Sequence, residues 1–159
     1  MMNYNLKYIP LFAVVLFAAC NNNQKMKDVK PQDAVVFPQG KKITNDNFTG
    51  TAYLKPLIDA DSLNSISVGN VTFEPGARSK WHTHPAGQIL LVIDGVGYYQ
   101  EKGQPKKILR KGDAIKCPAN VLHWHGAGAD SAFVQVAITG REKGETVWLN
   151  AVTDEEYNK

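Results

Sequence analysis

Hydrophobic and polar positions alternate in short runs along most of the chain from Phe48 onward. The runs are rich in valine, isoleucine, threonine and aromatic residues, and glycine, proline, asparagine or aspartate separates them. Successive residues of a β-strand point to opposite faces, and many short strands at close spacing are typical of a sandwich or small barrel. The pattern therefore predicts an all-β domain. Strands are expected at residues 48–54, 66–73, 88–93, 97–100, 106–110, 113–117, 121–125, 132–138 and 146–149.

The expected strand at 88–93, with the sequence QILLVI, is apolar on both of its faces. Such a strand is covered twice, by the core on one side and by a second sheet or a partner subunit on the other. A homo-oligomer, either a dimer or a larger assembly, is therefore one explanation of this segment. We expect the strand to end at a turn, because Asp94 and Gly95 form a frequent hairpin pair.

One short helix is expected, at the C-terminal end. Thr153 and Glu156 have the spacing of a capping box, in which each of the two side chains accepts a backbone N–H of the other residue. This spacing predicts a single helical turn over residues 153–158.

The first 19 residues have the features of a targeting segment rather than of the folded body. Lys7 gives a positive start, and residues 9–19 form an almost unbroken apolar run that ends at Cys20. The run is shorter than the roughly 20 residues of a membrane-spanning helix and fits the apolar region of a signal peptide. The small residues before Cys20 resemble a bacterial lipoprotein cleavage site, which implies lipidation of Cys20. The alternative is an ordinary secretory signal that is cut elsewhere.

The lipoprotein interpretation divides the chain into three parts and gives it a location. Residues 1–19 would be the signal peptide, residues 20–47 a flexible tether, and residues 48–159 one domain with its own core. A lipid anchor would hold the protein in the bacterial cell envelope, in the periplasm or at the outer membrane. With Cys20 lipidated, Cys117 is the remaining thiol, so no intramolecular disulfide is expected.

The charge of the mature chain gives no reason to expect a nucleic-acid partner. Cleavage before Cys20 removes Lys7 and leaves 17 basic against 15 acidic residues, a net charge of +2. A balance this even favours neither nucleic acid nor another polyanion. The expected partners are a small-molecule substrate, and the membrane through the lipid anchor.

All four histidines of the protein fall in two pairs, His82 with His84 and His123 with His125. Residues two apart in an extended strand share a face, so each pair points to one side. If both pairs line the interior of a barrel, four imidazoles meet in one cavity, where unpaired polar rings are costly to bury. A divalent metal ion would satisfy them. The alternative for any one of these residues is a solvated or hydrogen-bonded histidine.

Gln88 follows the first histidine pair, and its amide oxygen is a neutral metal ligand. The alternative is that Gln88 caps the turn at 85–87. Neutral ligands such as imidazoles and an amide leave a divalent ion its full charge, which makes a strong Lewis acid and favours an anionic substrate or product. Nitrogen-rich ligation by itself favours zinc, nickel or copper.

In residues 76–95 and 112–123, glycines, a proline, histidines and Gln88 recur at fixed spacings. These spacings resemble the two sequence motifs of the cupins, a family of β-barrel proteins. Most cupins have glutamate where this chain has Gln88, and that change, together with the sequence HWHGA at 123–127, resembles a narrower branch. That branch comprises small bacterial cupins that include the manganese-dependent (R)-selective hydroxynitrile lyases. The likeness runs from residue 48 to residue 157. The first motif, G-x5-H-x-H-x3-Q-x6-G, is formed by Gly76, His82, His84, Gln88 and Gly95, and the second, G-x5-P-x4-H, by Gly112, Pro118 and His123.

The resemblance implies a jelly-roll-like β-barrel in a single domain, a metal centre and a lyase reaction. The metal would be Mn²⁺, with iron, zinc or nickel as alternatives. His125, outside the cupin ligand set, would be the acid or base, or otherwise a residue that orients a ligand. The ligands implied are His82, His84, Gln88 and His123, and the pocket residues Gly69, Val71 and, where the lyases carry a polar residue, Thr139.

The reaction implied is cleavage of a cyanohydrin to an aldehyde and cyanide, with His125 as the base. One alternative keeps the metal but changes the chemistry to decarboxylation, isomerisation or oxidative cleavage of a small organic acid. A second alternative is a module that binds a small molecule or metal without chemistry. Fold alone does not choose among them, because one fold hosts many functions.

Overall fold

The computed structural model describes residues 36–159. The predicted signal peptide and the lipidated Cys20 lie outside these residues, and they stay predictions. Within the described range, no helix has both the length and the apolar character needed to cross a membrane.

The described residues form twelve strands and one short helix, which confirms the all-β prediction. Every strand pairing is antiparallel. The elements are β1 (Lys41–Lys42), β2 (Phe48–Thr49), β3 (Ala52–Ile58), β4 (Ile66–Phe73), β5 (Arg78–Ser79), β6 (His82–Thr83), β7 (Gln88–Glu101), β8 (Lys107–Arg110), β9 (Ala114–Cys117), β10 (His123–Ala127), β11 (Phe133–Gly140), β12 (Val147–Trp148) and α1 (Asp154–Asn158).

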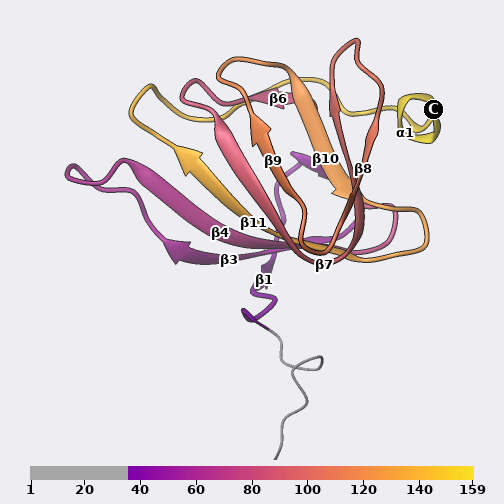
Figure 1. Ribbon diagram of the computed structural model, residues 1–159, viewed down its shortest axis with the longest axis horizontal. Helices are drawn as coiled ribbons and strands as arrows, with labels where there is room; N and C mark the ends of the chain where they lie inside the picture. Colours follow the sequence, from indigo (N-terminus) through magenta and orange to yellow (C-terminus); the bar gives the residue numbers. More distant parts are fainter. Residues whose placement is uncertain (1–35) are drawn as a thin grey trace, which may run out of the picture. The chain divides into compact units, whose positions relative to one another are not determined.

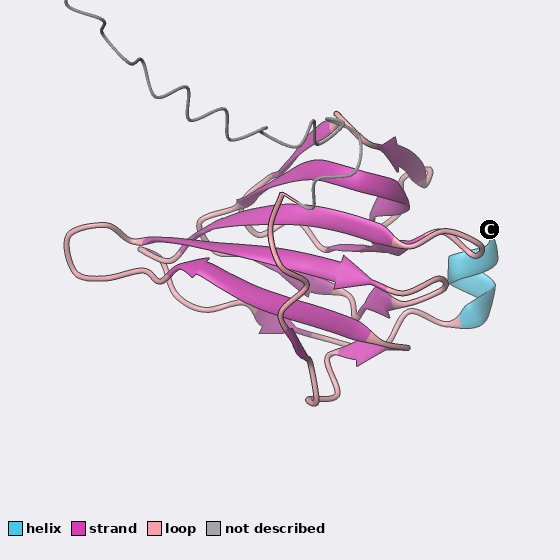
Figure 2. Ribbon diagram, turned by 90° about the horizontal axis from the view of Figure 1, so that it is seen from below, coloured by secondary structure: helices cyan, strands magenta, loops and turns pink. Residues whose placement is uncertain are grey.

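The strands form a curled sheet in two layers that share the long strand β7. One layer has the order β1-β3-β4-β11-β7, with β9 on the far edge of β7. The other layer has the order β8-β7-β10-β5-β2. In this layer β6 also pairs with β10, and β12 pairs with β6. Figures 1 and 2 show the layers enclosing a common interior, with α1 at one end. The expected barrel-like architecture is therefore present.

β7 corrects the predicted turn at Asp94 and Gly95. The chain does not reverse there but continues as one strand of 14 residues. Its first part pairs with β11, the register shifts where Ile93 bulges out, and residues 97–101 pair with β10 in the other layer. Gly95 has a φ of 76°, a left-handed conformation that favours glycine. The Asp-Gly pair thus marks a bend at which a strand changes layers.

We expect Gly95→Ala to be strongly destabilising. A Cβ at this position would lie 1.9 Å from the carbonyl oxygen of Ala132, so the backbone must shift in addition to the unfavourable φ. Together these effects should lower the free energy of unfolding by about 2 to 5 kcal/mol. Gly103→Ala is the matched control, because Gly103 has a φ of 81° and open space around it, and should cost about 1 to 2 kcal/mol. If urea unfolding shows the same loss of free energy of unfolding for both variants, the close backbone contact at the Gly95 bend is not important for stability.

The two faces of the first half of β7 differ in exposure. Leu90 and Val92 are buried in the core, whereas Ile89 and Leu91 are 44% and 39% exposed. No described part of the chain covers these outward side chains fully. The predicted partner subunit on this face therefore stays a prediction.

The folded body begins before Phe48, so the tether boundary predicted there is too late. Lys41 and Lys42 form β1, which pairs with Leu54 and Tyr53 of β3. The next residue, Ile43, donates its backbone N–H to the Ala52 carbonyl and packs against the core. This strand was not predicted because its two lysines are polar and exposed, so they form no apolar pattern that distinguishes a strand from a tether.

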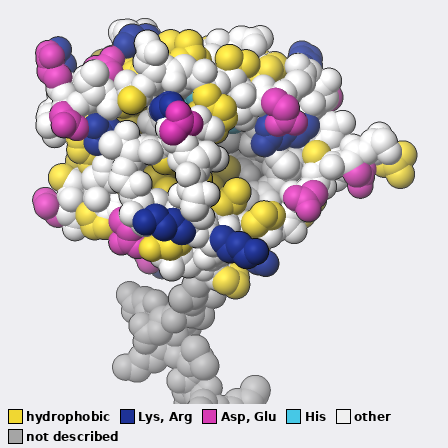
Figure 3. All heavy atoms as spheres, turned by 180° about the vertical axis from the view of Figure 1, so that it is seen from behind, with side chains coloured by type: hydrophobic (Ala, Val, Ile, Leu, Met, Phe, Trp, Pro, Cys, Tyr) yellow, Lys and Arg dark blue, Asp and Glu magenta, His cyan; other side chains and the backbone are white. Residues whose placement is uncertain are grey.

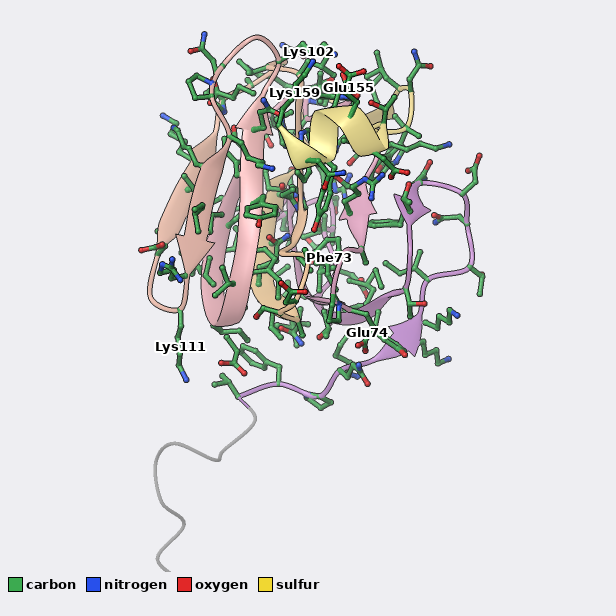
Figure 4. All side chains as sticks on the ribbon, turned by 90° about the vertical axis from the view of Figure 1, so that its right-hand side faces the viewer. Phe73, Glu74, Lys102, Lys111, Glu155 and Lys159 are labelled. Atoms are coloured by element: carbon green, nitrogen blue, oxygen red, sulfur yellow. The ribbon has the colours of Figure 1, made fainter. Side chains whose placement is uncertain are left out.

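The main core fills the space between the two layers. Phe73 of β4 and Phe133 of β11 are fully buried, with ring centroids 6.2 Å apart, and Figure 4 shows Phe73 pointing into the interior. Leu90 and Tyr99 of β7 are also fully buried in this cluster. Cys117 belongs to it too, and burial raises the pKa of its thiol to about 12, so it is an inert core residue.

The C-terminal helix closes one end of the molecule. The capping box of Thr153 and Glu156 is present, which confirms the predicted helical turn. Tyr157 donates its hydroxyl proton to the Ala127 carbonyl at the end of β10. Together with Trp81 and Trp124 it forms a second apolar cluster, around which the charged residues labelled near α1 in Figure 4 gather. This cluster supports β10 from the side opposite to its histidines.

Candidate metal centre

The structure brings all four histidines together in the interior. The ring centroid of His82 lies 5.0 Å from that of His84, 4.4 Å from that of His123 and 5.2 Å from that of His125. All four rings are at most 5% exposed, and almost no histidine is visible on the face shown in Figure 3. The predicted meeting of the two pairs is therefore present.

Strand register places the pairs opposite each other. His82 on β6 lies directly across from His123 on β10. Since alternate residues point to opposite faces, Trp81 and Trp124 turn away and enter the second apolar cluster. The histidines thus point into the interior, and the neighbouring tryptophans point away from it and hold the chain in place by packing in the second apolar cluster.

Backbone carbonyls fix the orientation of two rings. The Nδ1 atom of His82 lies 2.9 Å from the Lys80 carbonyl, and that of His123 lies 2.8 Å from the Val121 carbonyl. A carbonyl oxygen accepts and never donates, so each Nδ1 carries the proton of the neutral ring. The Nε2 atoms of these two rings therefore keep a lone pair for a ligand, as metal-binding histidines do.

His84 and Gln88 are held by hydroxyl groups instead. The Nδ1 atom of His84 lies 3.1 Å from the Thr146 hydroxyl oxygen. The Gln88 amide nitrogen donates to the Thr139 hydroxyl at 2.9 Å, which leaves the amide oxygen free to face the cluster. By holding the amide nitrogen, Thr139 orients Gln88 so that its oxygen, the better metal ligand, stays free.

Several buried polar atoms of the cluster have no hydrogen-bond partner among residues 36–159. Such atoms are rare and costly in a folded interior. A divalent cation fits this site, because it would satisfy several neutral donors at once and keep its charge. The atoms are His84 Nε2, Gln88 Oε1, His123 Nε2 and His125 Nε2.

His125 has a different partner from the other three rings. Its Nδ1 atom is 3.0 Å from the amide nitrogen of Gln135, a fully buried residue of β11. An amide that donates to Nδ1 leaves the proton on Nε2, whereas a half-turn of the amide would reverse the two roles. His82, His123 and His125 each offer a nitrogen within 4.8 Å of the others, so His125 is close enough to be either a ligand or a proton carrier.

Burial lowers the pKa of every histidine in the cluster. The pKa of His82 and His125 lies well below 6.5, because burial disfavours the charged ring and the neighbouring imidazoles add to the effect. Burial also lowers the pKa of His123. It lowers the pKa of His84 to about 3, with smaller contributions from His123 and the Arg141 guanidinium. All four rings are therefore neutral at pH 7, the state that metal ligation requires.

A pocket of about 260 Å³ leads from the surface to this cluster. Its walls are mainly apolar, and Trp148 stands beside His82 with ring centroids 4.8 Å apart. Gly69 and Val71 of β4 and Thr139 of β11 line it, at the places that the resemblance implies. Their role toward a substrate stays a prediction. The pocket is large enough for a small molecule of one aromatic ring.

Four residues around the site were not predicted from the sequence. Thr146, Trp148 and Arg141 belong to or flank the segment that leads into β12, and Gln135 lies on β11. Trp148 had no local signal to separate it from an ordinary core aromatic. Gln135 stands between Val134 and Val136, and an inward polar residue in such an apolar strand is a signal of the kind that singled out Gln88.

Comparisons with known proteins agree with this architecture. The cupin domain family matches residues 69–139. The (R)-mandelonitrile lyase of Granulicella tundricola is 42% identical over 115 residues, which are 72% of this chain and 88% of that protein. The crystal structure of a cupin-like protein from Thermotoga maritima has a TM-score of 0.76 and 46% identity, and the match covers 79% of this chain and 96% of that one.

A more distant neighbour shows the fold alone. The DMSP lyase DddQ from Ruegeria pomeroyi has a TM-score of 0.53 at 22% identity, over 65% of this chain and 52% of that one.

Three findings together identify the family of this chain. They are the two-layered sheet, the inward histidines and the similarity over most of a curated relative. The chain belongs to the cupin family.

Proposed function

We propose that the protein is a metal-dependent lyase that cleaves a cyanohydrin into an aldehyde and hydrogen cyanide. The observation that supports this most is the cluster of four neutral imidazoles and one amide oxygen at the closed end of a mainly apolar pocket. The similarity to a protein named (R)-mandelonitrile lyase supports the reaction class. The pocket volume suits a substrate with a single aromatic ring.

The ligands in this proposal are His82, His84, His123 and Gln88, as the family resemblance implies. The carbonyls of Lys80 and Val121 and the hydroxyls of Thr146 and Thr139 orient them. A bound divalent cation would supply Lewis acidity, which makes the substrate hydroxyl more acidic and favours release of an anion. Manganese is the ion that the resemblance implies.

His125 moves the proton in this proposal. Its Nε2 atom faces the cluster, and it takes the proton of the substrate hydroxyl as the bond between the hydroxyl carbon and the nitrile carbon breaks. The proton then passes to the departing cyanide, so the ring returns to its neutral state. As the base, the ring carries its resting proton on Nδ1, where the Gln135 amide oxygen accepts it after a half-turn of the amide. Nε2 then first accepts and later donates the substrate proton.

We expect His125→Asn to lower kcat/KM for mandelonitrile by about 100- to 10,000-fold, the usual contribution of a general base. The measurement is cyanide release by the metal-loaded protein, with elemental analysis of the same sample. A retained metal content with lost activity supports the proton-carrying role. Full activity would contradict that role, and loss of the metal together with activity would make His125 a ligand instead.

A further inference from the structure

Arg141 stands at the solvent side of the pocket, directly after β11. It is the one lysine or arginine among the described residues that line the pocket, and its side chain is 27% exposed. The histidines at the other end are at most 5% exposed. The pocket therefore has a cluster of ligand atoms at its closed end and a guanidinium at its mouth.

The surrounding structure holds the Arg141 guanidinium in place. Its Nε–H donates to the Ser67 hydroxyl of β4 at 3.0 Å, and one terminal nitrogen lies 3.3 Å from the Thr146 hydroxyl oxygen. The same hydroxyl lies 3.1 Å from His84 Nδ1, so a single side chain separates the guanidinium from the histidine cluster.

One edge of this guanidinium remains available to a ligand. Within residues 36–159, the second terminal nitrogen of Arg141 has no hydrogen-bond partner. The first pairs with Glu145 at 2.8 Å, but the Glu145 side chain is 86% exposed. Such exposed ion pairs contribute little to stability, so another carboxylate can replace Glu145. A planar carboxylate matches the arginine fork with two parallel hydrogen bonds.

The charges of the pocket favour an anionic ligand. The candidate metal ligands are neutral, so a bound divalent cation keeps its charge, and Arg141 adds a further positive charge. The acidic group among the described lining residues is Asp59, which is exposed and screened by water. Between the two positive ends the wall is apolar, with side chains such as Val68 and Ala137.

We propose that Arg141 is the specificity residue of this pocket and selects substrates that carry a carboxylate at the end remote from the reacting carbon. This inference rests on the proposed lyase function and names its substrate class, an aromatic or similarly apolar cyanohydrin with a distal carboxylate. The apolar wall takes the middle of the molecule, and the Arg141 fork takes the carboxylate. An alternative role for Arg141 is purely structural, as a link between β11, β4 and the segment before β12.

The test compares mandelonitrile with 4-carboxymandelonitrile on the metal-loaded protein and on its Arg141→Gln variant. The substitution should lower kcat/KM for the carboxylated substrate about 10- to 100-fold more than for mandelonitrile, mainly through KM, because a charged hydrogen-bond partner is lost. Arg141→Lys should lower kcat/KM for the carboxylated substrate by an intermediate amount. The matched control is Lys143→Gln, which removes the same charge from an exposed neighbour outside the pocket. Equal losses for both substrates would mean a structural role and overturn the proposal.

A binding measurement separates this inference from the reaction itself. Calorimetry with 4-carboxybenzyl alcohol and benzyl alcohol tests the same recognition without turnover. Suppose that Arg141→Gln binds the carboxylated alcohol more weakly and that the unsubstituted protein cleaves neither nitrile. This result would support the carboxylate site and contradict the proposed lyase function. Equal binding of the carboxylated alcohol to both proteins would overturn the carboxylate site, whatever the turnover shows.

Discussion

The metal-free protein is expected to lose stability steeply as the pH falls below 6.5. The four histidines have a pKa near 6.5 when unfolded, and burial lowers the pKa of each in the folded state. Below pH 6.5 the unfolded chain therefore binds protons that the folded chain does not. Acid thus favours unfolding, whereas above 6.5 the rings are neutral in both states and the effect vanishes.

The size of the effect follows from the number of rings. One pH unit below 6.5, each ring that stays neutral in the fold costs about 1.4 kcal/mol. The three rings with the largest shifts, His82, His84 and His125, therefore cost about 4 kcal/mol, and His123 adds to this loss. This loss is a large part of the whole stability of many small domains. For His84 the loss continues down to its folded pKa of about 3.

Urea unfolding of the metal-free protein at pH 7.5, 6.5 and 5.5 checks this expectation. His84→Gln should reduce the dependence by about a quarter, because one titrating ring is removed. Glu156 has a pKa lowered to about 2, mainly by its hydrogen bond from Lys102, so its contribution is lost only below about pH 4.5 and does not interfere. A free energy of unfolding that stays constant from pH 7.5 to 5.5 would show that the rings are not buried together.

The parts of the site that the sequence predicted depend on local geometry. Two residues of a strand that are two apart share a face, so His82 with His84 and His123 with His125 could be paired without any knowledge of the fold. That the two pairs face each other depends on the register of β6 against β10, which spacing within each strand does not determine. The resemblance to the cupin motifs supplied that information.

The parts that were missed depend on contacts between distant segments. Thr146 and His84 are 62 residues apart in the sequence, and Arg141 and Ser67 are 74 apart. No short sequence pattern can therefore predict either contact. The Asp94-Gly95 pair was misread for a related reason. A left-handed glycine serves a hairpin turn and a bend in a continuous strand equally well, and only the neighbouring strands distinguish them.

A divalent cation is expected to stabilise the protein strongly, and this effect should identify its ligands. A ligand that binds only the folded state at 100 times its dissociation constant raises the free energy of unfolding by about 2.7 kcal/mol. The unpartnered Nε2 of His84 and amide oxygen of Gln88 place both residues among the donors. We therefore expect His84→Phe to weaken Mn²⁺ binding by about 100-fold or more, and to reduce the stabilisation at the same concentration to about 0.4 kcal/mol or less.

His125→Asn distinguishes the two ways of choosing ligands in this cluster. The family resemblance implies that His84 and Gln88 bind the ion, whereas mutual distance alone groups His125 with His82 and His123. His125 is the proton carrier in the proposal above, and its Nδ1 is held by the Gln135 amide, so it is not among the proposed ligands. The Mn²⁺-dependent rise in melting temperature should therefore survive His125→Asn and disappear in His84→Phe. The opposite result would place the ion among His82, His123 and His125, and would leave His84 to bind the substrate instead.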